Sequence, residues 1–147
     1  MTAMRLEELC VLELHYTSEF HYVSPYEGES GKGWGLGEGT ATGDRLSGTV
    51  QWSNHPNGRG DGAMQPATRG VISTPDDALV MFDFTGRTLF VERDGETVGR
   101  QLLMTLFESD HDAYRWLNDT VCMTEGAIDP VRLVAHMEVH LCVPELV

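Results

Sequence analysis

Basic residues are scarce in this sequence of 147 residues. Lys and Arg total 10 against 23 Asp and Glu, which gives a formal net charge of -13 at pH 7. Nucleic acids and anionic lipid surfaces carry charge of the same sign and repel such a protein. The composition therefore predicts neither a nucleic acid nor a membrane as a partner.

Cysteines and long apolar runs are also few. Cys10, Cys122 and Cys142 are an odd number of thiols without C-x-x-C spacing, which favours reduced cysteines over a disulfide framework or a zinc knot. No run approaches the roughly 18 apolar residues of a membrane-spanning helix. The opening residues, "MTAMRLEELCVLELHY", lack the basic start and long apolar stretch of a signal peptide. We therefore expect a cytoplasmic protein.

Apolar and polar residues alternate along most of the chain. In "LEELCVLELHY", Cys10, Leu12 and Leu14 share one face of an expected strand. Similar runs are "RLSGTVQW", "MQPATRGVIST", "ALVMFDF", "RTLFVER", "GRQLLMTLFES" and "VRLVAHMEVHLCV". Turn signals such as Asn57-Gly58 and Asp94-Gly95 separate them. Only "SDHDAYRWLND", residues 109–119, predicts a helix, of about two turns.

These elements predict the fold class. Hydrophobic residues make up 41% of the chain, enough for a core, and the length fits one domain over residues 1–147. Roughly eight to ten short strands with one short helix predict an all-β fold, a single antiparallel β-barrel. A β-sandwich is the alternative. We favour the barrel from the spacing of the strands, and closure would also leave no exposed strand edge.

Two motifs carry a resemblance to a known family. "GEGTATGDRLSGTV" and "YRWLNDTVCMTEG" are similar to motifs of domain-of-unknown-function family 3237. The matching residues are Gly39, Gly43, Leu46, Gly48, Val50, Tyr114, Trp116, Leu117, Asn118 and Gly126. A third family motif, T-D-D-G-A, is altered here, because Pro75 and Asp77 replace its Asp and Gly. The resemblance implies a barrel of the allene-oxide-cyclase and lipocalin type that often self-associates, without an assigned reaction, so we expect a homo-oligomer.

The stretch "AHMEVH", residues 135–140, resembles a metal site at first sight. His136, Glu138 and His140 share one face of the expected strand. The opposite face is apolar from Val131 to Val143, as the interior of a small barrel requires. We therefore expect the histidines to face solvent or another subunit, and we predict no metal site.

Glycines occupy every second position from 33 to 39. Their spacing fits neither a dinucleotide-binding motif nor a P-loop. Glycines along one face of a strand mark a tight bend or a close approach of the backbone. We therefore predict no nucleotide site, and the sequence indicates no other cofactor.

Charged residues within apolar strands are the first candidates for chemistry. Asp83 lies on the face of Leu79 and Met81 in "ALVMFDF", and both faces of that strand are apolar. We therefore expect Asp83 to be partly buried, with Arg69 or Arg87 as its partner.

The stripe Arg100, Leu102, Met104, Leu106 and Glu108 has a charge at each end, as expected for an inward face that reaches the barrel mouths. A carboxylate in such a place suits proton transfer, and an arginine suits an anionic oxygen. The alternative is structural: an ion pair between strands and solvated charges at strand ends.

The polar loop "WSNHPNGRGDG", residues 52–62, and the expected helix complete the candidates. His55, Arg59 and Asp61 would close over a barrel mouth, or form only the tip of a hairpin. Trp116 would plug one end of the barrel, and Asn118 would end the helix. The predicted catalytic residues are thus Asp83, Glu108, Arg69 and His55, and the predicted substrate-binding residues are Trp52, Arg59, Asp61, Arg87, Trp116 and Asn118.

Three functional hypotheses follow from this pattern. The first is a cofactor-independent barrel enzyme, of isomerase, cyclase or lyase type, that acts on a small, largely apolar carbonyl or carboxylate compound in secondary or catabolic metabolism. The second is a barrel that binds a hydrophobic small molecule without turnover. The third is a structural subunit that assembles through its outer strand faces. Internal charges would favour the first.

Overall fold

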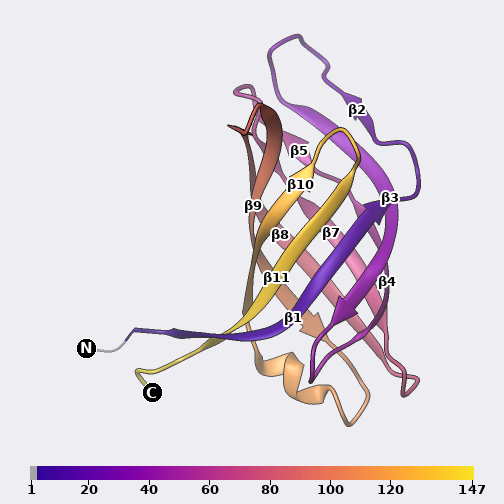
Figure 1. Ribbon diagram of the computed structural model, residues 1–147, viewed down its shortest axis with the longest axis vertical. Coiled ribbons are helices and arrows are strands. Elements are labelled where there is room, and N and C mark those ends of the chain that lie inside the picture. The colour runs from indigo at the N-terminus through magenta and orange to yellow at the C-terminus, as the bar shows by residue number, and fades with distance from the viewer. Residues whose placement is uncertain (1–2) are drawn as a thin grey trace.

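The computed structural model describes residues 3–147 and shows a β-barrel (Figure 1). Its strands are β1 (Arg5–Tyr16), β2 (His21–Val23), β3 (Gly31–Thr42), β4 (Gly48–Asn54), β5 (Asn57–Gly58), β6 (Met64–Gln65), β7 (Ala67–Ser73), β8 (Leu79–Arg93), β9 (Glu96–Glu108), β10 (Cys122–Asp129) and β11 (Val134–Val143). A 3₁₀-helix, η1 (Arg115–Asp119), follows β9. No helix among these residues is long and apolar enough to cross a membrane.

Eight of the strands close into a ring. The order is β1, β11, β10, β9, β8, β7, β4 and β3, and β3 pairs back with β1. Every pairing is antiparallel, and β2, β5 and β6 are short additions around one rim. The predicted all-β antiparallel barrel is therefore confirmed, with eight barrel strands and three extra ones.

Strict alternation along each strand divides the barrel wall into an inner and an outer face. In β8, Val80, Phe82 and Phe84 are buried inside, and the residues between them are exposed. In β11, Met137 and Val139 point inward in the same way. The histidines of this strand lie on the outer face, as the sequence predicted.

The glycine series in β3 makes room for aromatic rings in the interior. A Cβ atom on Gly33 would lie 2.5 Å from the Phe20 ring, and one on Gly35 would lie 2.5 Å from the Tyr16 ring. A Cβ atom on Gly37 would collide with the Trp52 indole. The expected close approach is therefore present, and most of it comes from aromatic side chains.

One end of the barrel is closed by the segment between β9 and β10. Leu117 of η1 is fully buried in the core, and Trp116 packs partly buried beside it. The predicted two-turn helix over residues 109–119 is wrong: only η1 is helical. The Asn118 side chain instead bonds both the N–H and the carbonyl of Ser109, which holds the segment as a compact turn.

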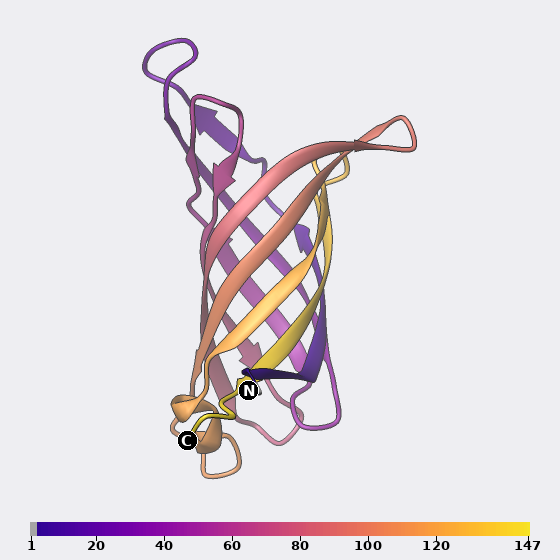
Figure 2. The ribbon, with the colours of Figure 1, turned by 90° about the vertical axis from the view of Figure 1, so that its left-hand side faces the viewer.

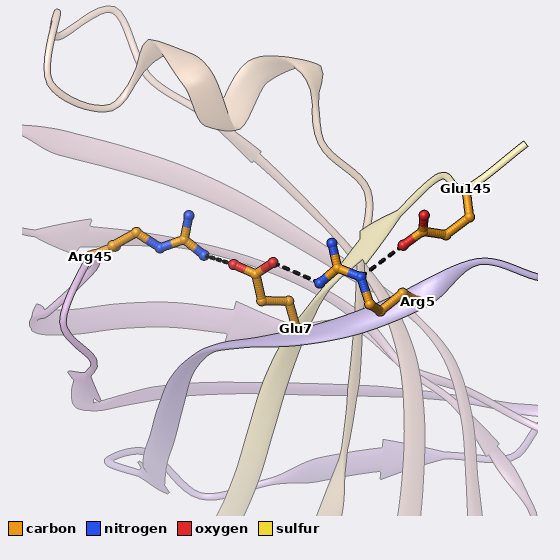
Figure 3. A network of polar contacts seen from close by, with 4 residues as sticks. All are labelled: Arg5, Glu7, Arg45 and Glu145. Carbon is orange, nitrogen blue, oxygen red and sulfur yellow. Dashed lines mark hydrogen bonds and ion pairs between the residues drawn. The ribbon is translucent and has the colours of Figure 1, made fainter. Parts of the chain in front are cut away.

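The start of β1 and the C-terminal tail meet at this closed end in a polar network (Figure 3). Arg5 contacts Glu145 at 2.7 Å and Glu7 at 3.1 Å, and Glu7 also contacts Arg45 at 2.8 Å. The Arg45 guanidinium lies 4.9 Å from the centre of the Trp116 ring. Exposed ion pairs contribute little each, but this chain of contacts links β1, the β3–β4 turn, the C-terminal tail and η1.

The two interior thiols predict a loss of stability in alkali. Burial raises the pKa of Cys10 to about 12 and that of Cys122 to about 11. Above about pH 9 the unfolded chain loses thiol protons that the folded chain keeps. The free energy of unfolding should therefore fall by up to about 1.4 kcal/mol per pH unit for each thiol.

Urea unfolding at a series of pH values between about 8 and 11 measures this slope. Because a Cys10→Ala/Cys122→Ala variant lacks both groups, its slope should be shallower. An equal slope in the two proteins would contradict the assignment.

Candidate functional site

An apolar cavity of about 370 Å³ opens at the end of the barrel opposite η1. Its lining comes from the barrel wall, from the segment around β2, and from the β5–β6 and β10–β11 connections. The lining residues are Tyr16, Phe20, Tyr22, Asn54, Pro56, Arg59, Gly62, Met64, Pro66, Thr88, Phe90, Gln101, Ile128, Pro130 and Leu133. A smaller void of about 30 Å³ shares six of these residues and extends toward Trp52 and Phe84. The interior is thus packed at one end and hollow at the other.

The main polar group of the cavity is a pair formed by Tyr16 and Asn54. The Asn54 amide Nδ2 donates a hydrogen bond to the Tyr16 hydroxyl at 3.1 Å. Its Oδ1 accepts from the Thr68 hydroxyl at 2.8 Å and from the Ala67 N–H at 3.2 Å. Because a backbone N–H can only donate, the Oδ1 must face Ala67, and this fixes the amide with its NH₂ toward Tyr16.

This arrangement leaves the phenolic proton of Tyr16 free to be donated. The hydroxyl oxygen already accepts from Asn54, so its own O–H can bond a ligand. Burial raises the pKa of Tyr16 above its usual value, and the Asn54 hydrogen bond opposes that shift in part. Tyr16 is therefore neutral near pH 7, and its hydroxyl is available as a hydrogen-bond donor.

A second neutral pair lies on the wall formed by β8 and β9. Gln101 Nε2 donates to the Thr88 hydroxyl at 3.1 Å, and both side chains are buried. Within residues 3–147 no buried side-chain nitrogen or oxygen lacks a partner. The polar side chains of the cavity wall, Tyr16, Asn54, Thr88 and Gln101, are therefore uncharged and hydrogen-bonded.

The rim of the cavity carries one ion pair. Arg59 lines the cavity, and its guanidinium donates to Asp61 at 2.7 and 3.1 Å. That contact is the main reason why the pKa of Asp61 falls to about 2. Of the loop residues that the sequence suggested, Arg59 lies at the cavity mouth, whereas His55 is exposed and lies outside the cavity lining.

The strongest candidates from the sequence lie on the outside of the barrel. Arg69 and Asp83 form the expected ion pair at 3.0 Å, but their side chains are 73% and 53% exposed. The expected burial of Asp83 is therefore wrong, as is the inward stripe that ends at Glu108. Arg87 is also exposed, and it donates to the Gly86 carbonyl. In β8 and β9 the residues that point inward are the ones that alternate with these candidates along each strand. Which of the two alternating sets points inward is determined by the pairing register of the strand.

The remaining candidates divide between the interior and the closed end. Trp52 is buried with its indole N–H donated to the Glu38 carbonyl at 3.1 Å, and it lines the deeper void. Trp116 and Asn118 belong to the turn at the closed end. They are therefore remote from the cavity.

One outer cluster has the donor atoms of a metal site. Ligand atoms of Glu125, Glu138 and His140 lie within 4.8 Å of one another. Glu125 and Glu138 are exposed and paired directly across β10 and β11. Such clusters are common on acidic surfaces, and we assign no metal to this one.

Tyr16 and Asn54 were missed by the sequence analysis, although their positions carried a signal. Tyr16 continues the inward face of Leu12 and Leu14 by one period, and Asn54 continues that of Trp52. A polar residue that follows an inward apolar series near a strand end is a candidate for the lining of a barrel mouth.

Comparison with known proteins identifies barrels of the same shape. A beta-barrel like protein from Acinetobacter baumannii AYE shares 15% sequence identity at a TM-score of 0.83, covering 97% of this chain and 98% of its own. A protein of unknown function from Clostridium acetobutylicum ATCC 824 shares 14% at a TM-score of 0.82, with coverage of 97% and 99%. At these identities the likeness shows the fold alone.

An enzyme from Penicillium herquei has the same fold at a TM-score of 0.72, with 17% identity and coverage of 97% of this chain and 96% of its own. No family model matches the chain, so the resemblance to family 3237 is not confirmed. No curated protein matches the chain either. The chain is thus similar in structure to small β-barrel proteins.

Proposed function

We propose that the cavity binds a small, uncharged and largely apolar molecule that carries a carbonyl group. The observation that supports this most directly is the Tyr16 hydroxyl, which Asn54 holds among apolar lining residues with its proton free. A carbonyl oxygen is the acceptor that such a donor fits. Neutral polar groups also suit an uncharged ligand, because burying a charge without a partner is costly.

We further propose that the protein is a cofactor-independent enzyme of isomerase, cyclase or lyase type. A fixed donor to a carbonyl strengthens its bond as negative charge grows on the oxygen, and one such donor contributes about 10²–10³-fold in rate. Confinement in a cavity of about 370 Å³ favours a folded, reactive conformation of a flexible substrate. The lining residues include no carboxylate, so activation of the carbonyl replaces the acid–base pair that the sequence suggested.

Binding of matched probes tests the first half of the proposal. Geranial is a small apolar aldehyde, and geranate is the same skeleton with a carboxylate. We expect geranial to bind and geranate to bind at least about tenfold more weakly, because the Arg59 guanidinium at the rim is already paired with Asp61 and does not repay the desolvation of the anion. Tyr16→Phe should weaken geranial binding by about two- to tenfold, the value of one hydrogen bond.

Calorimetry measures both affinities. Asp83→Asn, on the outer face, is the control variant and should bind as the wild type does. Equal binding of aldehyde and carboxylate, or an unchanged affinity in Tyr16→Phe, would contradict the proposed site.

The catalytic half is tested by native mass spectrometry of protein purified without added ligand. A released carbonyl compound is then incubated with wild type and Tyr16→Phe, and turnover should fall about 10²-fold in the variant. A compound that both proteins release unchanged would assign binding without catalysis.

A further inference from the structure

The outer face of β8 and β9 carries an apolar patch that is exposed to solvent. It consists of six large side chains that are between 36% and 56% exposed: Leu79, Met81, Leu89, Leu102, Met104 and Leu106. Figure 2 shows β8, β9 and β10 side by side on the face turned toward the viewer. Large apolar side chains gathered on an outer face mark an interaction surface.

Along β9, the apolar residues of this β8–β9 patch lie between two charges of opposite sign. From one end to the other, the outward residues are Arg100, Leu102, Met104, Leu106 and Glu108. Apolar residues lie at equal steps on either side of Met104. The two ends carry charges of opposite sign. A strand with this pattern is complementary to an antiparallel copy of itself.

The outward residues of β8 have a related symmetry, with the charges inside and the apolar residues at the ends. They run Met81, Asp83, Thr85, Arg87 and Leu89. Apolar residues lie at equal steps on either side of Thr85, and the charges between them are of opposite sign. β8 is therefore complementary to its own antiparallel copy about Thr85.

Both centres of symmetry lie in one row across the sheet. Thr85 pairs with Met104, and Met104 pairs with Met123 of β10. A two-fold axis along this row, at right angles to the strands, would relate two barrels packed face to face. It would place Arg100 opposite the second copy's Glu108. The alternative axis, along the strands, would place like charges against each other.

The charges needed for these contacts are available. Among residues 3–147 neither Arg100 nor Glu108 has an ion-pair partner. Arg87 bonds only a backbone carbonyl, and Asp83 uses one carboxylate oxygen for Arg69. With the flanking residues of β7 and β10 included, this face holds three arginines (Arg69, Arg87 and Arg100) and three acids (Asp83, Glu108 and Glu125). Its charges therefore balance within a chain whose net charge is -13, so it is a region where two copies repel little.

We propose that a second copy of this chain packs on the β8–β9 patch, with a two-fold axis through the row of Thr85, Met104 and Met123. The sheets meet face to face with antiparallel β9 strands, at the crossing angle of about 30° that twisted sheets adopt. The contact is isologous: Met104 meets its own copy, Leu102 meets Leu106, and the end charges form two equivalent ion pairs. The cavity mouths remain open, since they lie at the rim and not on this face.

Sedimentation equilibrium of the full chain gives the first test. Wild type should form a dimer at micromolar concentration, and Met104→Asp should raise the dissociation constant at least about 100-fold, because it buries two carboxylates at the centre. Leu36→Asp, on the outer face of β3, is the matched control and should leave the dimer intact. A wild type that stays monomeric at 100 µM, or a dimer that survives Met104→Asp, would overturn the proposal.

A charge exchange tests the geometry itself. Arg100→Glu and Glu108→Arg should each weaken self-association at least about tenfold, because each creates two like-charge contacts. A mixture of the two variants should form a heterodimer, since every facing pair is then of opposite charge. The proposed axis is wrong if the mixture associates no better than the single variants, while circular dichroism shows that both are folded.

Discussion

Replacing Gly37 by alanine is expected to lower the free energy of unfolding by about 3 kcal/mol, the upper range for overpacking a core. The new methyl group would overlap the Trp52 indole and the His15 carbonyl. Neither group can move freely. The indole N–H is bonded to the Glu38 carbonyl, and the indole packs edge-on against Tyr16 with 4.6 Å between the ring centroids. The His15 carbonyl belongs to the backbone of β1.

Urea unfolding followed by circular dichroism measures this loss. Glu38→Ala, the neighbouring position on the outer face of β3, is the control and should change stability by less than about 0.5 kcal/mol. The double variant Gly37→Ala/Trp52→Leu should lose less stability than the sum of the losses of the two single variants. The relief is partial, because the contact with the backbone of β1 remains. If Gly37→Ala unfolds as the wild type does, the aromatic rings do not fill the interior in this way.

The general architecture could be predicted because alternation is visible wherever one face of a strand is polar. In β1 and β11 the inward residues form an unbroken apolar series, and their orientation followed from the sequence. Closure into a barrel followed from the number of strands and the need to cover edges. Local patterns therefore sufficed for the fold.

The orientation of β8 and β9 could not be predicted in the same way, because both faces of these strands are apolar. In β9 the outer Leu102, Met104 and Leu106 look more like core than the inner Gln101 and Thr105. The interior accepts these polar residues because they are paired. Thr105 bonds Thr124 across β9 and β10 at 2.8 Å, and Gln101 bonds Thr88. Such pairs depend on strand register, which the sequence alone does not give.

The same ambiguity explains why the site was misplaced. Asp83 looked buried because apolar residues flank it on both sides, but those on its own face belong to the β8–β9 patch. Charged residues in an apolar strand can thus mark a contact between molecules as well as an interior site. Deciding between the two requires the face, and therefore the register.

Asn54→Leu is expected to affect both stability and the ionisation of Tyr16. The change removes the partner of the Thr68 hydroxyl, the Ala67 N–H and the Tyr16 hydroxyl together. Buried polar groups left unpaired cost about 1–3 kcal/mol each. We therefore expect a loss of about 3 kcal/mol in the free energy of unfolding.

The effect on Tyr16 separates a positioning role from a purely structural one. The Asn54 hydrogen bond lowers the pKa of Tyr16 against the effect of burial, so its removal should raise that pKa further. Titration of the protein labelled with ¹³C at the tyrosine Cζ follows Tyr16 directly, with Tyr16→Phe assigning its signal. Thr68→Val, which leaves the donor to Tyr16 in place, should lose only about 1 kcal/mol and shift the titration little. Should Asn54→Leu and Thr68→Val titrate alike, Asn54 does not hold the Tyr16 hydroxyl, and the donor geometry proposed for the cavity is wrong.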